Sequence, residues 1–456
     1  PPPLARLEIT QPDGPGFKVD GWNVQWANWN LRVGFNAREG LTLHDISFTD
    51  LDQPGGGARR PVLHRASVPE MIVPYGSPFD PSWRKCAFDA GEDGLGMNAN
   101  SLTRGGEDGL GCDCLGSIHY WDAHLVGADG EAETIPNAIC MHEEDSGLLW
   151  KHTDWRSGEA VSRRSRRLVL SFISTVANYE YGFYWNLYLS GTIELEVKLT
   201  GIVSCDVSAA SGAKDASAAK FGVPIAPGLN GVIHQHFFNV RLDMAVDGGA
   251  PEGSELVEMD VASLKGIADA PADDVHHNGF LHTERRLETE GEARRQCDAV
   301  ASRTWKVCSL AHRNRMGVNC AYRLVPGGNT SPYAQPNSFL LQRAGFLKHQ
   351  LWATEYRPGE LHSSGPYPNQ RSTDDGLSVF CQPDNSLTGK RIVLWYTMGV
   401  THVPRAEDWP IMPVQHCRFH LEPDNFFDRN PTIRLPASDA GGRPAPDCDG
   451  CVPSKL

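Results

Sequence analysis

The sequence predicts a mostly β protein with one large, mostly antiparallel domain. Apolar and polar side chains alternate near a period of two in three segments, at residues 168–173, 192–199 and 237–244. The chain holds 46 glycines and 32 prolines, and turn clusters such as residues 222–224 separate the segments. Helix is expected only in short pieces, as near residues 337–347. We therefore expect a β domain over residues 1–435 and a small, polar, proline-bearing tail over residues 436–456.

Composition and charge argue against two classes of partner. About 40% of the 456 residues are hydrophobic and 21% are charged, which allows a sizeable core. The formal net charge is -14, and the densest basic stretch, residues 163–167, leads straight into an apolar strand. A nucleic acid is therefore not an expected partner. No long apolar run exists, so a membrane-spanning helix is not expected either.

Both ends of the chain carry a signal about processing or location. The first six residues, 1–6, lack the charged and apolar regions of a signal peptide and read like a linker after a missing piece. The chain ends in Ser454, Lys455 and Leu456, the tripeptide that the peroxisomal import receptor reads at a C-terminus. We therefore expect a peroxisomal protein whose mobile tail presents this tripeptide.

The pair His234 and His236 is a first candidate for chemistry. Residues two apart on a strand point to the same face, so both imidazoles can reach one metal ion. Imidazole suits copper and zinc, and nitrogen ligands with water in tetragonal geometry favour Cu(II). Because the chain has 17 histidines, this spacing alone leaves both a metal site and a chance pattern open.

A second candidate is the segment Thr175–Gly182, which reads Thr-Val-Ala-Asn-Tyr-Glu-Tyr-Gly. Without context it is a strand whose Tyr179 and Tyr181 pack at a period of two. It also matches the pattern Thr-x-x-Asn-Tyr-(Asp or Glu)-Tyr, and in this it resembles the copper amine oxidases. In that family the first tyrosine of the pattern is oxidised to topaquinone, which the resemblance places at Tyr179. The histidine pair follows 55 residues after Tyr179, as the resemblance requires.

The resemblance also implies the third copper ligand. Residues 401–413 resemble the family segment Thr-His-x-Pro-x-x-Glu-Asp-x-Pro-x-Met-Pro, which implies His402 as the ligand beside His234 and His236. His416 and His420 lie close by in the sequence and are interpreted as loop or surface histidines. A copper ion on three neutral imidazoles keeps an open position for water or dioxygen.

Residues around the quinone follow from the same resemblance. Residues 88–92 imply Asp89 as the general base, because a buried carboxylate can take the α-proton of a bound amine. The hydroxyl of Tyr75 is implied to hold a quinone oxygen, and Asn178 to restrict the swing of the ring. The small Ala87 suggests a roomy pocket mouth, and the surroundings of Trp121 are expected to shape the pocket.

The family's peripheral divalent-cation site is only half present. Asp243 and Met244 match its first ligands, and Ile392 offers a carbonyl oxygen. Arg391 stands where the family has an aspartate, and a guanidinium repels a cation. A second metal is therefore doubtful.

The resemblance covers residues 21–431 and implies more than the site. It implies a large antiparallel β-sandwich (a super-sandwich), a homodimer, and a disulfide between Cys114 and Cys140. The small domains that usually precede the catalytic domain are expected to be absent from this chain. Cysteines other than this pair are interpreted as buried or free thiols.

The activity that the resemblance implies is the oxidation of a primary amine by dioxygen, which yields an aldehyde, ammonia and hydrogen peroxide. Copper and topaquinone are the implied cofactors, and peroxide production suits a peroxisome. One alternative is a non-catalytic β-sandwich that binds copper or zinc and keeps Tyr179 unmodified. Another is a different histidine-based metal oxidase, which predicts that Tyr179→Phe keeps activity.

Overall fold

The computed structural model describes residues 5, 9–53, 57–103, 113–207, 220–248, 253–265 and 274–436. Antiparallel pairing within them builds two large sheets and one small sheet, so the predicted mostly β fold is confirmed. No helix in these ranges is long and apolar enough to cross a membrane. The tripeptide Ser454, Lys455 and Leu456 lies outside the described residues.

In all three sheets the order of the strands in space differs from their order along the chain. From edge to edge, the eight-stranded sheet contains β1 (Phe17–Asp20), β2 (Asn23–Trp26), β3 (Trp29–Asn36), β4 (Gly40–Asp50), β5 (Ala58–Ile72), β14 (His234–Met244), β20 (Ile392–His402) and β19 (Leu351–Glu355). The ten-stranded sheet contains β16 (Phe280–Leu287), β15 (Ser254–Ser263), β17 (Thr304–Arg313), β18 (Asn319–Pro326), β21 (Met412–Asp424), β10 (Ile193–Gly201), β9 (Tyr179–Tyr188), β8 (Ala160–Val176), β7 (Ala132–Thr153) and β6 (His119–Val126). The three-stranded sheet contains β11 (Cys205–Val207), β13 (Leu229–Val232) and β12 (Gly222–Ala226).

The helices are short, as the sequence predicts. They are α1 (Phe339–Arg343), α2 (Leu377–Phe380), the 3-10 turns η1 (Ser82–Arg84), η4 (Val246–Gly248), η5 (Gly345–Lys348) and η6 (Ala406–Asp408), and the π-helical turn η2 (Asp89–Asp93). The helix expected near residues 337–347 is present as α1 and η5. The three segments with period-two patterns lie in β8, β10 and β14, except for Thr192, which directly precedes β10.

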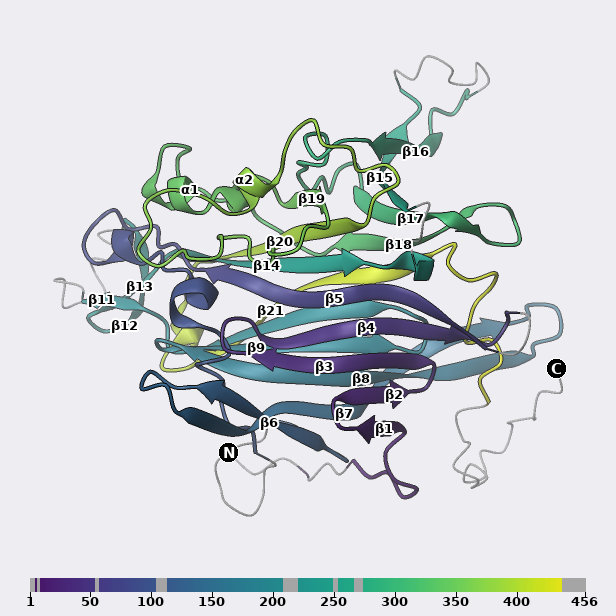
Figure 1. The fold of residues 1–456 in the computed structure, drawn as a ribbon, viewed down its shortest axis with the longest axis horizontal. Coiled ribbons are helices and arrows are strands. Elements are labelled where there is room, and N and C mark those ends of the chain that lie inside the picture. The colour runs from purple at the N-terminus through teal and green to yellow at the C-terminus, as the bar shows by residue number, and fades with distance from the viewer. Residues whose placement is uncertain are drawn as a thin grey trace.

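The two large sheets stack face to face, and the main core lies between them. In Figure 1 the strands β3, β4 and β5 cross in front of β8 and β9. Trp29 and Leu43 from the first sheet belong to one buried cluster with Trp185 and Leu195 from the second. Alternation positions these side chains, because every second residue of a strand faces the opposite sheet.

Strand β14 is buried along its whole length, unlike the edge strands. Phe238 belongs to the core between the sheets, whereas Phe237 belongs to a second cluster with Trp395 and Phe346 on the outer face. Residues of α1 and α2 belong to that outer cluster and cover this face of the sheet. By the period of two, His234 and His236 share the inward face with Phe238. This places both histidines at the end of the space between the two sheets.

A disulfide ties the segment before β6 to β7. Cys114 and Cys140 are bonded and buried, so the implied disulfide is present in the structure. The Sγ of Cys140 also lies 3.5 Å from Nδ1 of His142 on the same strand.

Candidate metal centre and active site

The three predicted histidines meet at one point. In the ladder between β14 and β20, His234 is paired directly with His402. His236 lies two residues along β14 on the same face. One ligand atom from each of the three buried residues lies within 4.8 Å of the other two. Two neighbouring strands of one sheet therefore supply the whole set.

The second ring nitrogen of each histidine has its own partner. Nδ1 of His234 lies 2.7 Å from the carbonyl oxygen of Val232, and Nδ1 of His236 lies 3.0 Å from the hydroxyl of Tyr181. Nε2 of His402 lies 2.9 Å from a carboxylate oxygen of Asp408. Partners of this kind orient the rings of metal-binding histidines. They leave Nε2 of His234, Nε2 of His236 and Nδ1 of His402 to converge.

The chemistry of this donor set fits copper. Burial lowers the pKa of His234 to about 3 and the pKa of His236 well below its usual value, so both rings are neutral. Nε2 of His236 is buried and has no hydrogen-bond partner among the described residues. An orphaned acceptor that converges with two further imidazole nitrogens is the arrangement that a divalent copper or zinc ion satisfies.

Tyr179 begins strand β9 directly beside this centre. The two-residue turn before it contains Ala177, whose φ is 52°, and Asn178. The hydroxyl of Tyr179 lies 3.2 Å from Nε2 of His234 and accepts a hydrogen bond of 3.0 Å from the backbone N–H of Ser204. Burial raises the pKa of the phenol well above its usual value.

Tyr75 lies on the other side of the same hydroxyl. Its ring stacks on His234 with the ring centroids 5.1 Å apart, and its hydroxyl hydrogen-bonds with that of Tyr179. Burial raises the pKa of Tyr75 to about 12, so it is a neutral phenol at physiological pH. The structure thus brings Tyr75, Tyr179 and the three histidines together.

Asp89 is a buried carboxyl group in the π-helical turn η2. Its Oδ2 atom has no hydrogen-bond partner within the described part of the chain. Burial raises its pKa well above the usual value, and the negative charges of Glu70, Asp93 and Glu92 add to the effect. Phe88, the residue before Asp89, pairs with Ile72, which lies three residues before Tyr75. The charge of Asp89 also helps to raise the pKa of Tyr75. A free, basic carboxylate in a buried site is suited to accept a proton.

Of the remaining predicted residues, two lie next to site residues in the sequence and one lies elsewhere in the fold. Ala87 and Asn178 are exposed, the first two residues before Asp89 and the second in the turn before Tyr179. Trp121 lies on β6, which is separated from β9 by β7 and β8. Its ring contacts those of Trp22 and His119, and its Nε1 donates to the Gly21 carbonyl. The structure therefore does not bring Trp121 to the site.

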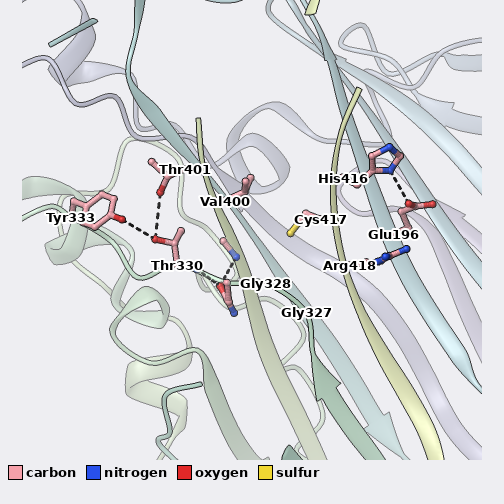
Figure 2. A pocket seen from close by; sticks show the side chains of 12 residues that line it. Glu196, Gly327, Gly328, Thr330, Tyr333, Val400, Thr401, His416, Cys417 and Arg418 are labelled. Carbon is pink, nitrogen blue, oxygen red and sulfur yellow. Dashed lines mark hydrogen bonds and ion pairs between the residues drawn. The ribbon is translucent and has the colours of Figure 1, made fainter. Parts of the chain in front are cut away.

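His416 and His420 lie on the surface of β21, and not in a loop. Nδ1 of His416 lies 2.8 Å from Glu196, and Nε2 of His420 lies 3.2 Å from Glu194. His416, Glu196 and Thr330 line a pocket of about 840 Å³. Figure 2 shows this pocket with the three residues labelled. The copper-site histidines, Tyr179 and Asp89 do not line this pocket, so it is separate from the candidate site.

The second-cation site does not fit a metal ion. Nε and Nη2 of Arg391 each donate a 2.8 Å hydrogen bond to the carboxylate of Asp243, and Arg241 approaches it to 3.6 Å. The Arg391 guanidinium also lies 3.8 Å from the centroid of the Tyr356 ring. Met244 and Ile392 are buried beside this pair. A guanidinium already neutralises the carboxylate that a cation would need.

Sequence reasoning gave no role to three residues that the structure places around the site. Asp408 holds His402, Tyr181 holds His236, and Glu70 lies beneath the Asp89 turn. The spacing from His402 to Asp408 and the period of two between Tyr179 and Tyr181 were available signals. No local pattern pointed to Glu70, because its partners are distant in the sequence.

Comparison with known proteins agrees with this geometry. The family model described as "Copper amine oxidase, enzyme domain" matches residues 18–441. The chain belongs to the copper amine oxidase family. This family uses copper and topaquinone, and the histidine triad described above fits a copper site.

Curated relatives and solved structures of this family cover nearly the whole chain. It is 47% identical to the peroxisomal copper-containing diamine oxidase 1 of Nicotiana tabacum over 97% of the chain and 54% of the relative. It is 45% identical to the primary amine oxidase of Arthrobacter sp. (strain P1) over 95% of the chain and 63% of the relative. The crystal structure of a copper-containing benzylamine oxidase from Hansenula polymorpha matches with a TM-score of 0.84 and 36% identity, over 95% of the chain and 64% of that structure. The chain therefore spans about half to two thirds of the length of these amine oxidases.

Proposed function

We propose that this chain oxidises primary amines to aldehyde, ammonia and hydrogen peroxide, with dioxygen, copper and a quinone made from Tyr179. The observation that carries the proposal is the position of the Tyr179 hydroxyl, 3.2 Å from Nε2 of His234 and beside the converging nitrogens. Copper and topaquinone, when bound here, supply the redox chemistry and the electrophilic carbonyl that side chains lack.

The chain's own residues have distinct roles in this proposal. Asp89 takes the α-proton of the substrate amine, because its Oδ2 has no hydrogen-bond partner among the described residues and burial raises its pKa. Tyr75 fixes the ring edge through the bond between the two hydroxyls. Asn178 limits the rotation of the ring from the turn before it. Ala87, small and exposed, leaves a wide opening in front of Asp89.

Copper loading tests this function directly. Metal-free protein is incubated with Cu(II) in air, and the quinone is followed by its visible band and by titration with phenylhydrazine. We expect a band in the wild-type protein, none in Tyr179→Phe, and none in wild-type protein loaded with Zn(II). Peroxide release is then measured against a panel of primary amines. Absence of both band and peroxide in the copper-loaded wild type would leave a non-catalytic metal protein.

We further propose that the protein acts as a peroxisomal homodimer, whose catalytic domain spans residues 1–435 and whose tail spans residues 436–456. The C-terminal tripeptide and the peroxisomal name of the tobacco relative support the location and an interaction with the import receptor. Exposed apolar residues on long hairpins support the dimer: Trp155 is 82% exposed between β7 and β8, and Phe280 on β16 is 75% exposed. Figure 1 shows β16 projecting from the body of the molecule.

A further inference from the structure

Glu70 is a fully buried carboxylate that lies beneath the turn carrying Asp89. Its Oε1 accepts hydrogen bonds from the backbone N–H groups of Ala90 at 3.0 Å and Gly91 at 3.2 Å. Its Oε2 accepts a short hydrogen bond from the Ser364 hydroxyl, and Nη2 of Arg38 lies 3.6 Å away. Strand β5 therefore holds the two peptide groups that directly follow Asp89.

The packing at Gly91 shows how close this contact is. A Cβ atom at this position would lie 2.5 Å from Cγ of Pro368 and 2.8 Å from Oε2 of Glu70. Only glycine allows the backbone to approach the carboxylate in this way. The turn that carries Asp89 therefore packs directly against the Glu70 carboxylate.

A second carboxylate holds the backbone at Phe88, the residue before Asp89. Glu92 accepts a 2.7 Å hydrogen bond from the backbone N–H of Phe88 and a 2.6 Å bond from Nη2 of Arg343. Hydrogen bonds from two carboxylates therefore fix the backbone on both sides of Asp89. Oδ2 of Asp89 itself has no hydrogen-bond partner among the described residues. This arrangement fixes the base without using its reactive oxygen.

Glu70 and Glu92 differ in how well their charges are neutralised. Glu92 has a direct pair with Arg343, whereas Arg38 is 3.6 Å from Glu70 and also donates to Ser364 and to the carbonyl of Gly365. Burial raises the pKa of Glu70, and the donors from Ser364, Ala90 and Met71 together with Arg38 oppose this effect. After burial, Glu70 is the largest of the charges that raise the pKa of Asp89, ahead of Asp93 and Glu92.

We propose that Glu70 is a positioning residue for amine oxidation, which seats the Asp89 turn through two backbone hydrogen bonds and places a negative charge beneath the base. This inference rests on the proposed function for its kinetic consequences. Its structural part, the seating of the turn, holds for the protein without metal or quinone.

Two substitutions separate the charge from the hydrogen bonds. Glu70→Gln keeps an acceptor for Ala90 and Gly91 and removes the charge. We expect the acidic limb of the kcat/KM profile to move to lower pH, because Asp89 loses a like charge that raises its pKa. Glu70→Ala removes both features, and we expect kcat to fall on the order of 10- to 100-fold because the base is misplaced. Quinone content by phenylhydrazine should stay at the wild-type level in both variants.

Glu290→Gln is the matched control. Glu290 is also fully buried and accepts backbone N–H groups, from Glu355 at 3.0 Å and Gln382 at 2.6 Å, but it is not among the charges that affect Asp89. The Glu290→Gln substitution should lower the free energy of unfolding and leave the pH profile of kcat/KM unchanged. A Glu70→Gln profile that superimposes on the wild type would overturn the electrostatic role.

Hydrogen exchange of the metal-free protein tests the seating without any activity. The peptide containing residues 88–93 should exchange faster in Glu70→Ala than in wild type and in Glu290→Gln. Unchanged exchange would overturn the seating. If wild-type protein loaded with copper oxidises no amine, the proposed function fails, and this exchange experiment still decides whether Glu70 holds the turn.

Discussion

His234 and His402 are 168 residues apart in the sequence and face each other across one rung of the β14–β20 ladder, with Nε2 and Nδ1 3.4 Å apart. Sheet register thus brings the first and the last histidine of the triad together. Because a slip of one residue would turn His402 to the other face of the sheet, the pairing of these two strands decides whether the site exists.

Asp408 should control copper affinity through His402. Asp408→Asn weakens the 2.9 Å contact with Nε2 and frees the ring to turn, so we expect copper affinity to fall about 10- to 100-fold. Competition with a coloured chelator measures the copper affinity of each variant. Glu407→Gln, which changes the exposed neighbouring carboxylate, is the control and should bind copper as the wild type does. Equal affinities for both variants would remove Asp408 from the metal centre.

Asp89→Asn should separate quinone formation from turnover. Removing the general base is expected to lower kcat by roughly 10²- to 10⁴-fold. The phenylhydrazine titre should remain near the wild-type value, because Oδ2 of Asp89 forms no hydrogen bond with the histidines or with any other described residue. Amine oxidation at the wild-type rate by this variant would reject Asp89 as the base.

The same substitution should stabilise the metal-free protein in a pH-dependent way. The folded-state pKa of Asp89 is raised, so ionisation costs stability as the pH rises from about 4, the unfolded value, through the folded pKa. Asparagine does not ionise, and the variant should therefore gain Tm relative to wild type as the pH rises. The difference should vanish below about pH 4, where both side chains are neutral. Thermal unfolding between pH 3 and pH 8 checks this, and a gain that is constant with pH would contradict it.

Arg391 should stabilise the fold by neutralising buried Asp243, the role that a peripheral cation would otherwise have. Among the described residues, Arg391→Ala leaves buried Asp243 with Arg241 at 3.6 Å as its one remaining arginine partner. We expect a loss of about 1–2 kcal/mol in the free energy of unfolding, less than for fully buried pairs because Arg391 is 40% exposed. Denaturant unfolding measures the loss, and Arg418→Ala on the exposed face of β21 is the control. Calcium added to metal-free wild-type protein should leave Tm unchanged. A calcium-dependent rise in Tm would show that a cation binds despite the arginine.

The C-terminal tripeptide should direct the protein to peroxisomes. A fluorescent fusion that ends in Ser454, Lys455 and Leu456 should give punctate fluorescence that overlaps a peroxisomal marker. Removal of the three residues should leave the fusion in the cytosol, and Pro453→Ala, just before them, should not. Peroxisomal fluorescence after the removal would discount the tripeptide.

Much of the fold and the site could be predicted because the signals were local. Alternation within β10 and β14 predicted strands, and the order of residues 175–182 pointed to Tyr179. Trp121 lies on β6, three strands away from β9, and no local pattern near it indicated this separation. The disulfide between Cys114 and Cys140 came from the resemblance and is present.

The sequence by itself determined which groups are available: two histidines on one strand face, a tyrosine in a specific pattern, and an aspartate in a turn. Only the tertiary structure decided how they act together. Stacking of the sheets brings Tyr179 to His234. Glu70 on β5 holds the Asp89 turn by accepting a backbone hydrogen bond from Ala90. Burial there shifts the pKa values of Asp89 and His234, and burial depends on distant segments that no local pattern contains.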